Sequence, residues 1–258
     1  MTQMTQMTQM TRMTRMTRMT TATKVDKSAD RVRRMFGEIA TQYDRMNHLL
    51  SMQVDRYWRR RTVQLVPPVG QRPILDLCTG TGDLAFAYHR AAQGRVPIVA
   101  ADFCKPMLDV GEAKKRQRGI NDQITFVEAD AQNLPFDEEH FQIVCVAFGL
   151  RNVADTDRGL SEMARVTSAG GKVAVLEFSQ PTAQPLKALY GWYFRNVLPR
   201  IGQLLARNDQ AAYEYLPESV GEFPHGEALA ERMRGAGLTD VWFRPLTFGI
   251  ATLYVGTK

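Results

Sequence analysis

Apolar residues along the chain gather in short continuous runs, and between these runs they recur every three or four positions. The continuous runs are rich in Val, Ile and Phe and predict strands, whereas the spaced pattern predicts amphipathic helices. Strands are expected at 74–77, 97–102, 124–130, 141–149, 172–178, around 242–243, and at 250–255. Their alternation with helical segments predicts an α/β fold with a doubly wound, mostly parallel sheet, which binds ligands at the carboxyl ends of its strands.

A helical region precedes the first predicted strand. Apolar positions between 32 and 40 recur at helical spacing, so the folded chain is expected to begin near Asp30 with an amphipathic helix. The segments 43–51 and 57–61 extend this region and carry a basic face. Two interpretations remain open: a solvated helix pair, or a lid over the ligand end of the sheet whose arginines meet anionic lipid headgroups.

The loop after the first strand has the most specific short pattern. Residues 80–83 read Gly-Thr-Gly-Asp and follow an apolar run that contains Asp76. Glycines let the chain turn sharply and let a ligand approach the main chain closely. Because the segment 80–85 also fits the dinucleotide fingerprint, the loop alone does not separate a nicotinamide cofactor from S-adenosylmethionine (SAM).

Acidic residues near this loop favour SAM. Asp102 ends the second predicted strand, and its carboxylate can accept hydrogen bonds from both hydroxyls of an adenosyl ribose, which both cofactors contain. Asp130 ends the third strand, where an acid can bind an adenine amino group. Asp83 would repel a pyrophosphate at the helix N-terminus, whereas the sulfonium and ammonium groups of SAM suit it.

Length and composition fit one enzyme-sized domain. The chain has 258 residues, 44% of them apolar, which is enough for a sizeable core. No apolar run approaches the ~20 residues that span a bilayer, so a cytoplasmic protein is expected. The cysteines Cys78, Cys104 and Cys145 lack metal-ligand spacing, so buried, reduced thiols and no metal are expected.

The net charge of +6 comes from the N-terminal segment 1–34, and the rest of the chain is neutral. The basic balance therefore gives no reason to expect a nucleic-acid partner. Residues 1–20 repeat Met-Thr-Gln and then Met-Thr-Arg, a period that matches neither helix nor strand. Residues 1–29 are expected to be a disordered tail, with a targeting peptide as the alternative, and residues 30–258 to form the domain.

Several longer motifs resemble one enzyme family. They are Tyr43-Asp-Arg-Met-Asn47 with Ser51 and Trp58, Leu75-Asp-Leu-Cys-Thr-Gly-Thr-Gly-Asp83, Phe148-Gly-Leu-Arg-Asn-Val153, Leu176-Glu-Phe-Ser179 and Tyr215-Leu-Pro-Glu-Ser-Val220. From Val32 almost to the C-terminus, the chain is similar to the quinone-biosynthesis C-methyltransferases of the menaquinone and ubiquinone group. Many SAM methyltransferases share the glycine loop, whereas the first and third motifs are much more specific.

The resemblance implies a seven-stranded, Rossmann-like class I methyltransferase that uses SAM to methylate a ring carbon of a prenylated quinol, usually demethylmenaquinol in bacteria. Ala147, where ubiquinone-competent members often carry serine, favours a menaquinone-only substrate. Asp55 stands where the family has histidine, which puts a histidine-based mechanism at that position in doubt. Benzoquinol methylation, methylation of another small molecule or a protein, and, more remotely, NAD-dependent oxidoreduction remain alternatives.

Site residues can be named from these patterns. The cofactor site is expected to contain Asp76, Gly80, Thr81, Gly82, Asp102, Asp130 and Ala131. The substrate site is expected to contain Tyr43, Asn47, Trp58 and Asn152.

Catalysis needs a group that stabilises or generates a phenolate, because a quinol carbon becomes nucleophilic when the neighbouring phenol loses its proton. Arg151 follows the fourth strand and is expected to stabilise that oxyanion or orient a water, since arginine stays protonated. The alternative for Arg151 is a structural salt bridge that holds the lid. His48 is the other candidate base, although a lone helical histidine is more often structural.

The prenyl chain of such a substrate stays in the bilayer. A protein without a spanning helix is therefore expected to visit the inner face of the cytoplasmic membrane peripherally. The expected contacts are the arginines at 59–61 and the aromatic insertion at 179–223, which is also a candidate substrate lid. The oligomeric state stays open.

Overall fold

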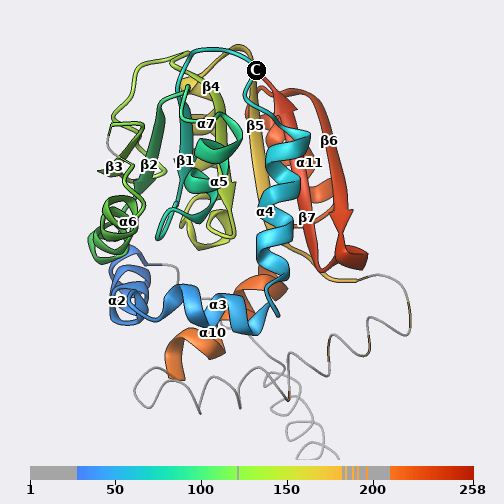
Figure 1. The fold of residues 1–258 in the computed structure, drawn as a ribbon. Coiled ribbons are helices and arrows are strands. Elements are labelled where there is room, and N and C mark those ends of the chain that lie inside the picture. The colour runs from blue at the N-terminus through green and yellow to red at the C-terminus, as the bar shows by residue number, and fades with distance from the viewer. Residues whose placement is uncertain are drawn as a thin grey trace, which may run out of the picture.

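The computed structural model describes residues 28–120, 122–181 and 210–258, together with the single residues 184, 188, 191 and 196. A single seven-stranded sheet with helices on both faces forms its centre (Figure 1). The strands are β1 Ile74–Leu77, β2 Ile98–Asp102, β3 Ile124–Glu128, β4 Phe141–Ala147, β5 Thr167–Phe178, β6 Thr239–Leu246 and β7 Ala251–Thr257. The predicted α/β fold is confirmed.

The strand order is β3-β2-β1-β4-β5-β7-β6. Neighbours among β1 to β5 pair in parallel, and β7 runs antiparallel to both β5 and β6. The winding reverses between β1 and β4, so the crevice beyond their carboxyl ends is the topological switch point, where folds of this class bind ligands.

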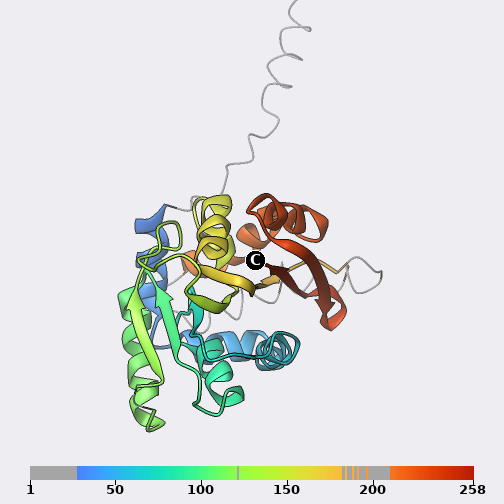
Figure 2. The ribbon, with the colours of Figure 1, turned by 90° about the horizontal axis from the view of Figure 1, so that it is seen from above.

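Helices cover both faces of the sheet (Figure 2). One face carries α4 Val54–Leu65, α5 Asp83–Ala91 and α6 Lys105–Gln117, and the other carries α7 Thr156–Val166 and α11 Glu227–Gly235. Successive strand residues serve opposite faces: Ile74 packs in the cluster that contains Trp58 and Tyr88, and Leu75 packs in the cluster that contains Met163. This alternation explains why the strands read as continuous apolar runs.

Within the described residues, three further helices lie beyond the carboxyl ends of the parallel strands (Figure 1): α2 Ala29–Ile39, α3 Tyr43–Leu50 and α10 Gln210–Glu222. Val32 and Met35 of α2 are buried, as the helical spacing predicts. Helix α2 contacts α6, and α10 contacts both α2 and the short 3₁₀ helix η1 Leu150–Asn152. A second 3₁₀ helix, η3 Thr247–Gly249, precedes β7.

Strand β5 begins five residues before the predicted start at residue 172. Thr167 pairs with Phe141, and the register then shifts before Lys172 pairs with Ile143. Gly170 takes a positive φ of 74° within this irregular stretch, a conformation that glycine adopts without strain.

The expected tail up to residue 27 and most of the aromatic insertion, 182–209, lie outside the described residues. Among the residues that are described, no helix is long and apolar enough to cross a bilayer.

Candidate active site

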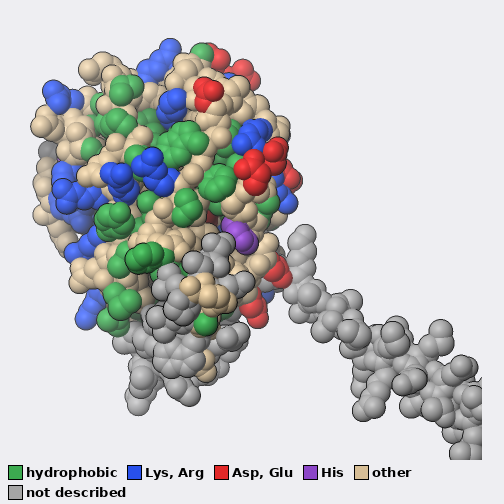
Figure 3. Space-filling model, turned by 90° about the vertical axis from the view of Figure 1, so that its right-hand side faces the viewer, with side chains coloured by type: hydrophobic (Ala, Val, Ile, Leu, Met, Phe, Trp, Pro, Cys, Tyr) green, Lys and Arg blue, Asp and Glu red, His purple; other side chains and the backbone are tan. Residues whose placement is uncertain are grey.

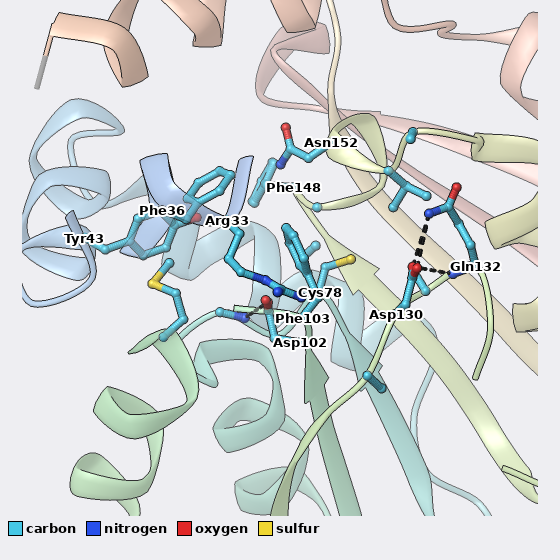
Figure 4. Close-up of a pocket in the computed structure, with 18 residues that line it drawn as sticks. Arg33, Phe36, Tyr43, Cys78, Asp102, Phe103, Asp130, Gln132, Phe148 and Asn152 are labelled. Carbon is cyan, nitrogen blue, oxygen red and sulfur yellow. Dashed lines mark hydrogen bonds between the residues drawn. The ribbon is translucent and has the colours of Figure 1, made fainter. Parts of the chain in front are cut away.

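A cavity opens at the switch point, between the strand ends and the helices α2 and α3, which are called the lid below (Figure 4). Its walls come from the loops after β1, β2, β3 and β4 and from α2 and α3. The lining residues are Arg33, Phe36, Tyr43, Cys78, Gly80, Asp102, Phe103, Met107, Ala129, Asp130, Ala131, Gln132, Ala147, Phe148, Gly149, Asn152, Val153 and Ala154.

The glycine loop forms the floor of this cavity. Gly80 and Gly82 take positive φ values of 57° and 88°, so both positions suit a residue without a Cβ. Gly80 lines the cavity. A Cβ on Gly82 would lie 2.8 Å from a ring carbon of Phe126, so this glycine lets the loop approach β3 closely.

Asp76 stabilises the glycine loop from its buried side. It is almost fully buried and is not among the lining residues. Its Oδ2 accepts hydrogen bonds from Thr79 Oγ1 at 2.6 Å and from the N–H of Ala85 at 3.0 Å. Burial raises the pKa of Asp76 to about 7. The carboxyl group thus joins the end of β1 to the first turn of α5.

Asp102 lies in the cavity wall at the end of β2. Its Oδ2 accepts from the N–H of Gly80 at 2.8 Å, and its Oδ1 accepts from the N–H of Cys104 at 2.9 Å. The residue is only 7% exposed, and this burial raises the pKa of its carboxyl to about 6, although backbone hydrogen bonds oppose the shift. At neutral pH it is mainly a carboxylate with lone pairs left for a ligand.

Asp130 and Ala131 line the cavity beyond β3. The Asp130 carboxylate is exposed, and its Oδ1 accepts from the backbone N–H of Gln132 at 2.9 Å and from Gln132 Nε2 at 3.2 Å (Figure 4). These bonds fix the orientation of the acid at the cavity rim.

Two aromatic side chains from the lid face the strand ends. Phe36 and Tyr43 meet edge to face, with ring centroids 5.9 Å apart and planes at 76°. Burial raises the pKa of Tyr43, and the guanidinium of Arg151, a side-chain hydrogen bond with Asn47 and the guanidinium of Arg59 oppose that shift. The Tyr43 hydroxyl therefore stays protonated at neutral pH.

Arg151 forms a buried ion pair, but with Glu177 of β5 rather than with the lid. Its NH1 lies 3.1 Å from Glu177 Oε2 and also donates to the carbonyl of Phe148. Nε of Arg151 is buried and has no hydrogen-bond partner among the described residues. The residue does not line the cavity, whereas its neighbour Asn152 does. Asn152 Oδ1 is likewise buried without a partner in the described part of the chain.

Thr81 and Asp83 belong to a polar network instead of the cavity wall. Lys114 of α6 donates to Asp44 of α3 at 2.7 Å, to Asp83 of α5 at 2.6 Å and to Thr81 at 3.1 Å. The Thr81 hydroxyl in turn donates to Asp44. This network ties the lid helix to the glycine loop, a role that sequence spacing did not reveal.

His48 extends that network to α4. Its Nδ1 lies 2.8 Å from Asp55 Oδ2, and its Nε2 lies 3.8 Å from Asp83 Oδ2. Although burial opposes it, the Arg59 guanidinium and hydrogen bonds from Ser51 and His48 hold the pKa of Asp55 below its usual value. An imidazole thus contacts position 55 even though this chain has no histidine there.

The three residues His48, Asp55 and Asp83 have metal-ligand chemistry, with candidate ligand atoms within 4.8 Å of one another. However, Arg59 already pairs with Asp55, and Lys114 already pairs with Asp83. The charges of the cluster are therefore balanced within the chain by an ion-pair network.

The expectation that the arginines at 59–61 contact lipid together is wrong for Arg59. Its side chain is 11% exposed, pairs with Asp55 at 2.5 Å, and lies 5.6 Å above the ring of Phe148. Arg60 is exposed, whereas Arg61 is half-buried and donates to Gln64.

Trp58 lies behind Phe148 in the core. Its Nε1 donates to Thr247 Oγ1 at 2.7 Å, and its ring contacts Phe148 and Phe178 at centroid distances of 5.6 and 6.0 Å. Trp58 is not among the lining residues, although it supports one of them.

Of the predicted site residues, the structure brings together six around the cavity: Tyr43, Gly80, Asp102, Asp130, Ala131 and Asn152. The other six do not line it: Asp76, Thr81, Gly82, Asn47, Trp58 and Arg151. The prediction did not include the other twelve lining residues, among them Arg33, Phe36 and Phe103. Phe103 follows the strand-ending acid directly, which is the sequence signal that marks it, while the two residues of α2 carry no such signal.

Known proteins resemble this chain over most of its length. A model of the ubiE/COQ5 methyltransferase family matches residues 23–258. A demethylmenaquinone methyltransferase of Bacteroides fragilis is 39% identical over 232 residues, which cover 90% of this chain and 94% of that protein. A ubiquinone/menaquinone biosynthesis C-methyltransferase of a Geobacter species is 43% identical over 234 residues, which cover 91% of this chain and 99% of that protein. A solved SAM-dependent methyltransferase from Thermotoga maritima, 18% identical, shares the fold with a TM-score of 0.62 over 87% of this chain and 99% of that one.

Proposed function

The chain belongs to the ubiE/COQ5 methyltransferase family, and on that premise we propose that it transfers the methyl group of SAM to a ring carbon of a demethylmenaquinol. The observation that carries the proposal is full-length similarity to proteins named for this reaction, together with a cavity at the switch point. Ala147, where ubiquinone-competent members often carry serine, lines that cavity and supports the naphthoquinol.

The donors and acceptors around the cavity fit SAM. Asp102 would accept hydrogen bonds from the ribose hydroxyls, and Asp130 with Ala131 would border the adenine. The methionine part would lie over Gly80 beneath Tyr43. SAM supplies an electrophilic methyl group when it is bound, and the aromatic and apolar lid residues would exclude water from it.

Arg151 and Asn152 support a hydroxyl-bearing substrate. The Nε–H of Arg151 is a donor without a partner in the described residues, and Oδ1 of Asn152 is an acceptor without one. Asn152 lines the cavity, so its amide oxygen would accept from a phenolic hydroxyl, whereas Arg151 is buried beside it and would act on the oxygen through its charge. As the quinol loses its proton, Arg151 would stabilise the phenolate that makes the ring carbon nucleophilic. Tyr43, which feels the charges of Arg151 and Arg59, would orient the quinol ring.

The proposal can be tested with reduced naphthoquinols and benzoquinols of matched prenyl length in detergent. Because Ala147 lines the cavity, we expect S-adenosylhomocysteine to be released at least about tenfold faster with the demethylnaphthoquinol than with the benzoquinol. Equal or faster turnover of the benzoquinol would favour the ubiquinone-type reaction, and no turnover of either would contradict quinol methylation.

We further propose that the protein reaches this substrate from the membrane surface. Met52, Tyr57 and Phe248 are 76%, 52% and 81% exposed. Exposed Arg56 and Arg60 flank Tyr57 on α4 and form no ion pair among the described residues. Figure 3 shows the side of the molecule where Lys and Arg side chains lie among hydrophobic ones.

Vesicles that contain anionic lipid would test this surface. Each surface cation contributes on the order of 1 kcal/mol near such lipid, so Arg56→Gln with Arg60→Gln should weaken binding at least about tenfold, and salt should weaken binding of the wild type. Arg232→Gln with Arg234→Gln, on α11, is the matched control and should bind as the wild type does. Equal binding of both double variants would contradict the assignment of this surface.

A further inference from the structure

Glu177 is an almost fully buried carboxylate near the end of β5, within the motif at 176–179, to which the sequence assigned no role. Its Oε1 accepts from the backbone N–H of Arg151 at 3.1 Å. Its Oε2 accepts from Arg151 NH1 and from the N–H of Phe178, both at 3.1 Å. One carboxylate therefore holds both the main chain and the side chain of Arg151.

Two other contacts also hold the guanidinium of Arg151 in place. NH1 also donates to the carbonyl of Phe148, and the guanidinium carbon lies 5.2 Å from the ring centroid of Phe178. The hydrogen-bonding capacity of NH1 is thus directed at the protein, whereas Nε has no partner among the described residues. The carboxylate therefore fixes where the positive charge of the guanidinium lies.

We propose that Glu177 is a positioning residue, which holds the guanidinium of Arg151 behind the cavity wall at Asn152, so that its positive charge acts on the quinol oxygen. The inference rests on the proposed function, since it assumes that the oxygen belongs to the methyl acceptor. A charge that is fixed before the reaction need not reorganise as charge develops, and this is the usual source of oxyanion stabilisation in enzymes. Without Glu177, Arg151 would be a buried charge without a counterion and would turn toward other acceptors.

The variant Glu177→Gln tests this role because it keeps the size of the side chain and removes the charge. The amide retains one acceptor oxygen, so it cannot serve all three donors. We expect kcat to fall at least about tenfold while KM for SAM stays within about twofold. In the Arg151→Ala background the same substitution should lower kcat no further, because Glu177 acts through Arg151.

Glu162→Gln is the matched control. Glu162 is also buried, pairs with an arginine, Arg165, at 2.8 Å and accepts from the N–H of Leu134, and none of these three residues lines the cavity. Both variants should melt at lower temperature, but only Glu177→Gln should lose kcat per folded molecule. A wild-type kcat for folded Glu177→Gln, or an equal loss in the two variants, would overturn the inference.

If Glu177→Gln does not fold, Glu177→Asp keeps the charge and draws it back by one methylene group. Its kcat should then fall while KM for SAM is unchanged, and a wild-type kcat overturns the inference. Failure of the proposed function gives a different result. If wild-type protein does not methylate the naphthoquinol, or if Arg151→Ala retains kcat, the function or the role of Arg151 is wrong, and the inference falls with it. If both hold and only the Glu177 variants behave as wild type, the inference alone is wrong.

Discussion

Substitution of Asp102 by alanine should separate cofactor affinity from protein stability. The carboxylate is expected to accept two charge-assisted hydrogen bonds from the ribose of SAM, each worth about 1.5–3 kcal/mol. Loss of both should raise the Kd for SAM by at least about a hundredfold.

The same substitution has a compensating effect on the free protein. Burial raises the pKa of Asp102 to about 6, well above its ordinary value of 3.8. A carboxyl whose folded pKa is raised destabilises the fold above its unfolded pKa, here by about 3 kcal/mol at pH 7. Alanine removes that cost but also removes the acceptor for the N–H groups of Gly80 and Cys104. We therefore expect a large change in affinity with a small change in melting temperature.

Calorimetric titration of SAM and thermal unfolding should be measured on the same preparation. Asp109→Ala is the control, because Asp109 is an exposed acid on α6 whose partner is Lys105. The control should bind SAM as the wild type does. A Kd for Asp102→Ala within about threefold of the wild type would refute the placement of the ribose, since it falls below even one charged hydrogen bond.

Three further outcomes follow from particular contacts. The Kd of the wild type for SAM should rise as pH falls from 7 to 5, because Asp102 with its pKa of about 6 gains a proton, and titrations of Asp102→Ala across that range should show no such dependence. Gly149→Ala should lower the free energy of unfolding by about 1–3 kcal/mol, since the new Cβ would lie 2.3 Å from Cβ of Cys78. Denaturant unfolding checks this against the control Gly235→Ala, whose new Cβ would meet nothing within 4 Å, and equal stabilities of the two variants would contradict it. Lys114→Met should loosen the lid by removing ion pairs of 2.6 and 2.7 Å, so KM for SAM should rise several-fold and limited proteolysis within α3 should quicken; unchanged proteolysis would contradict the role of this network.

Local sequence was sufficient for much of the fold and for the acids at the strand ends. Strands β1 and β4 are buried on both faces, so each is a continuous apolar run with one polar residue, Asp76 or Gln142. Asp102 and Asp130 could be placed because parallel strands bring their carboxyl ends to one edge of the sheet.

Contacts between distant positions could not be predicted in the same way. Arg151 of η1 pairs with Glu177 of β5, and nothing in the sequence specifies that partner in place of the lid. Arg59 lies in a run of three arginines that resembles a solvated face, yet Asp55 one turn earlier draws it inward. Lys114 likewise reads in the sequence as one of several cations at the end of a helix, and only the fold places the carboxylates of Asp44 and Asp83 next to it.

The most direct test of the account is the position of the transferred methyl group. Protein, reduced demethylmenaquinol and SAM labelled with ¹³C at its methyl carbon should be incubated together, and the product examined by mass spectrometry and ¹³C NMR. We predict a mass gain of one labelled methyl group, with the label bonded to a ring carbon. A label on a quinol oxygen, or no labelled quinone at all, would contradict carbon methylation by this site.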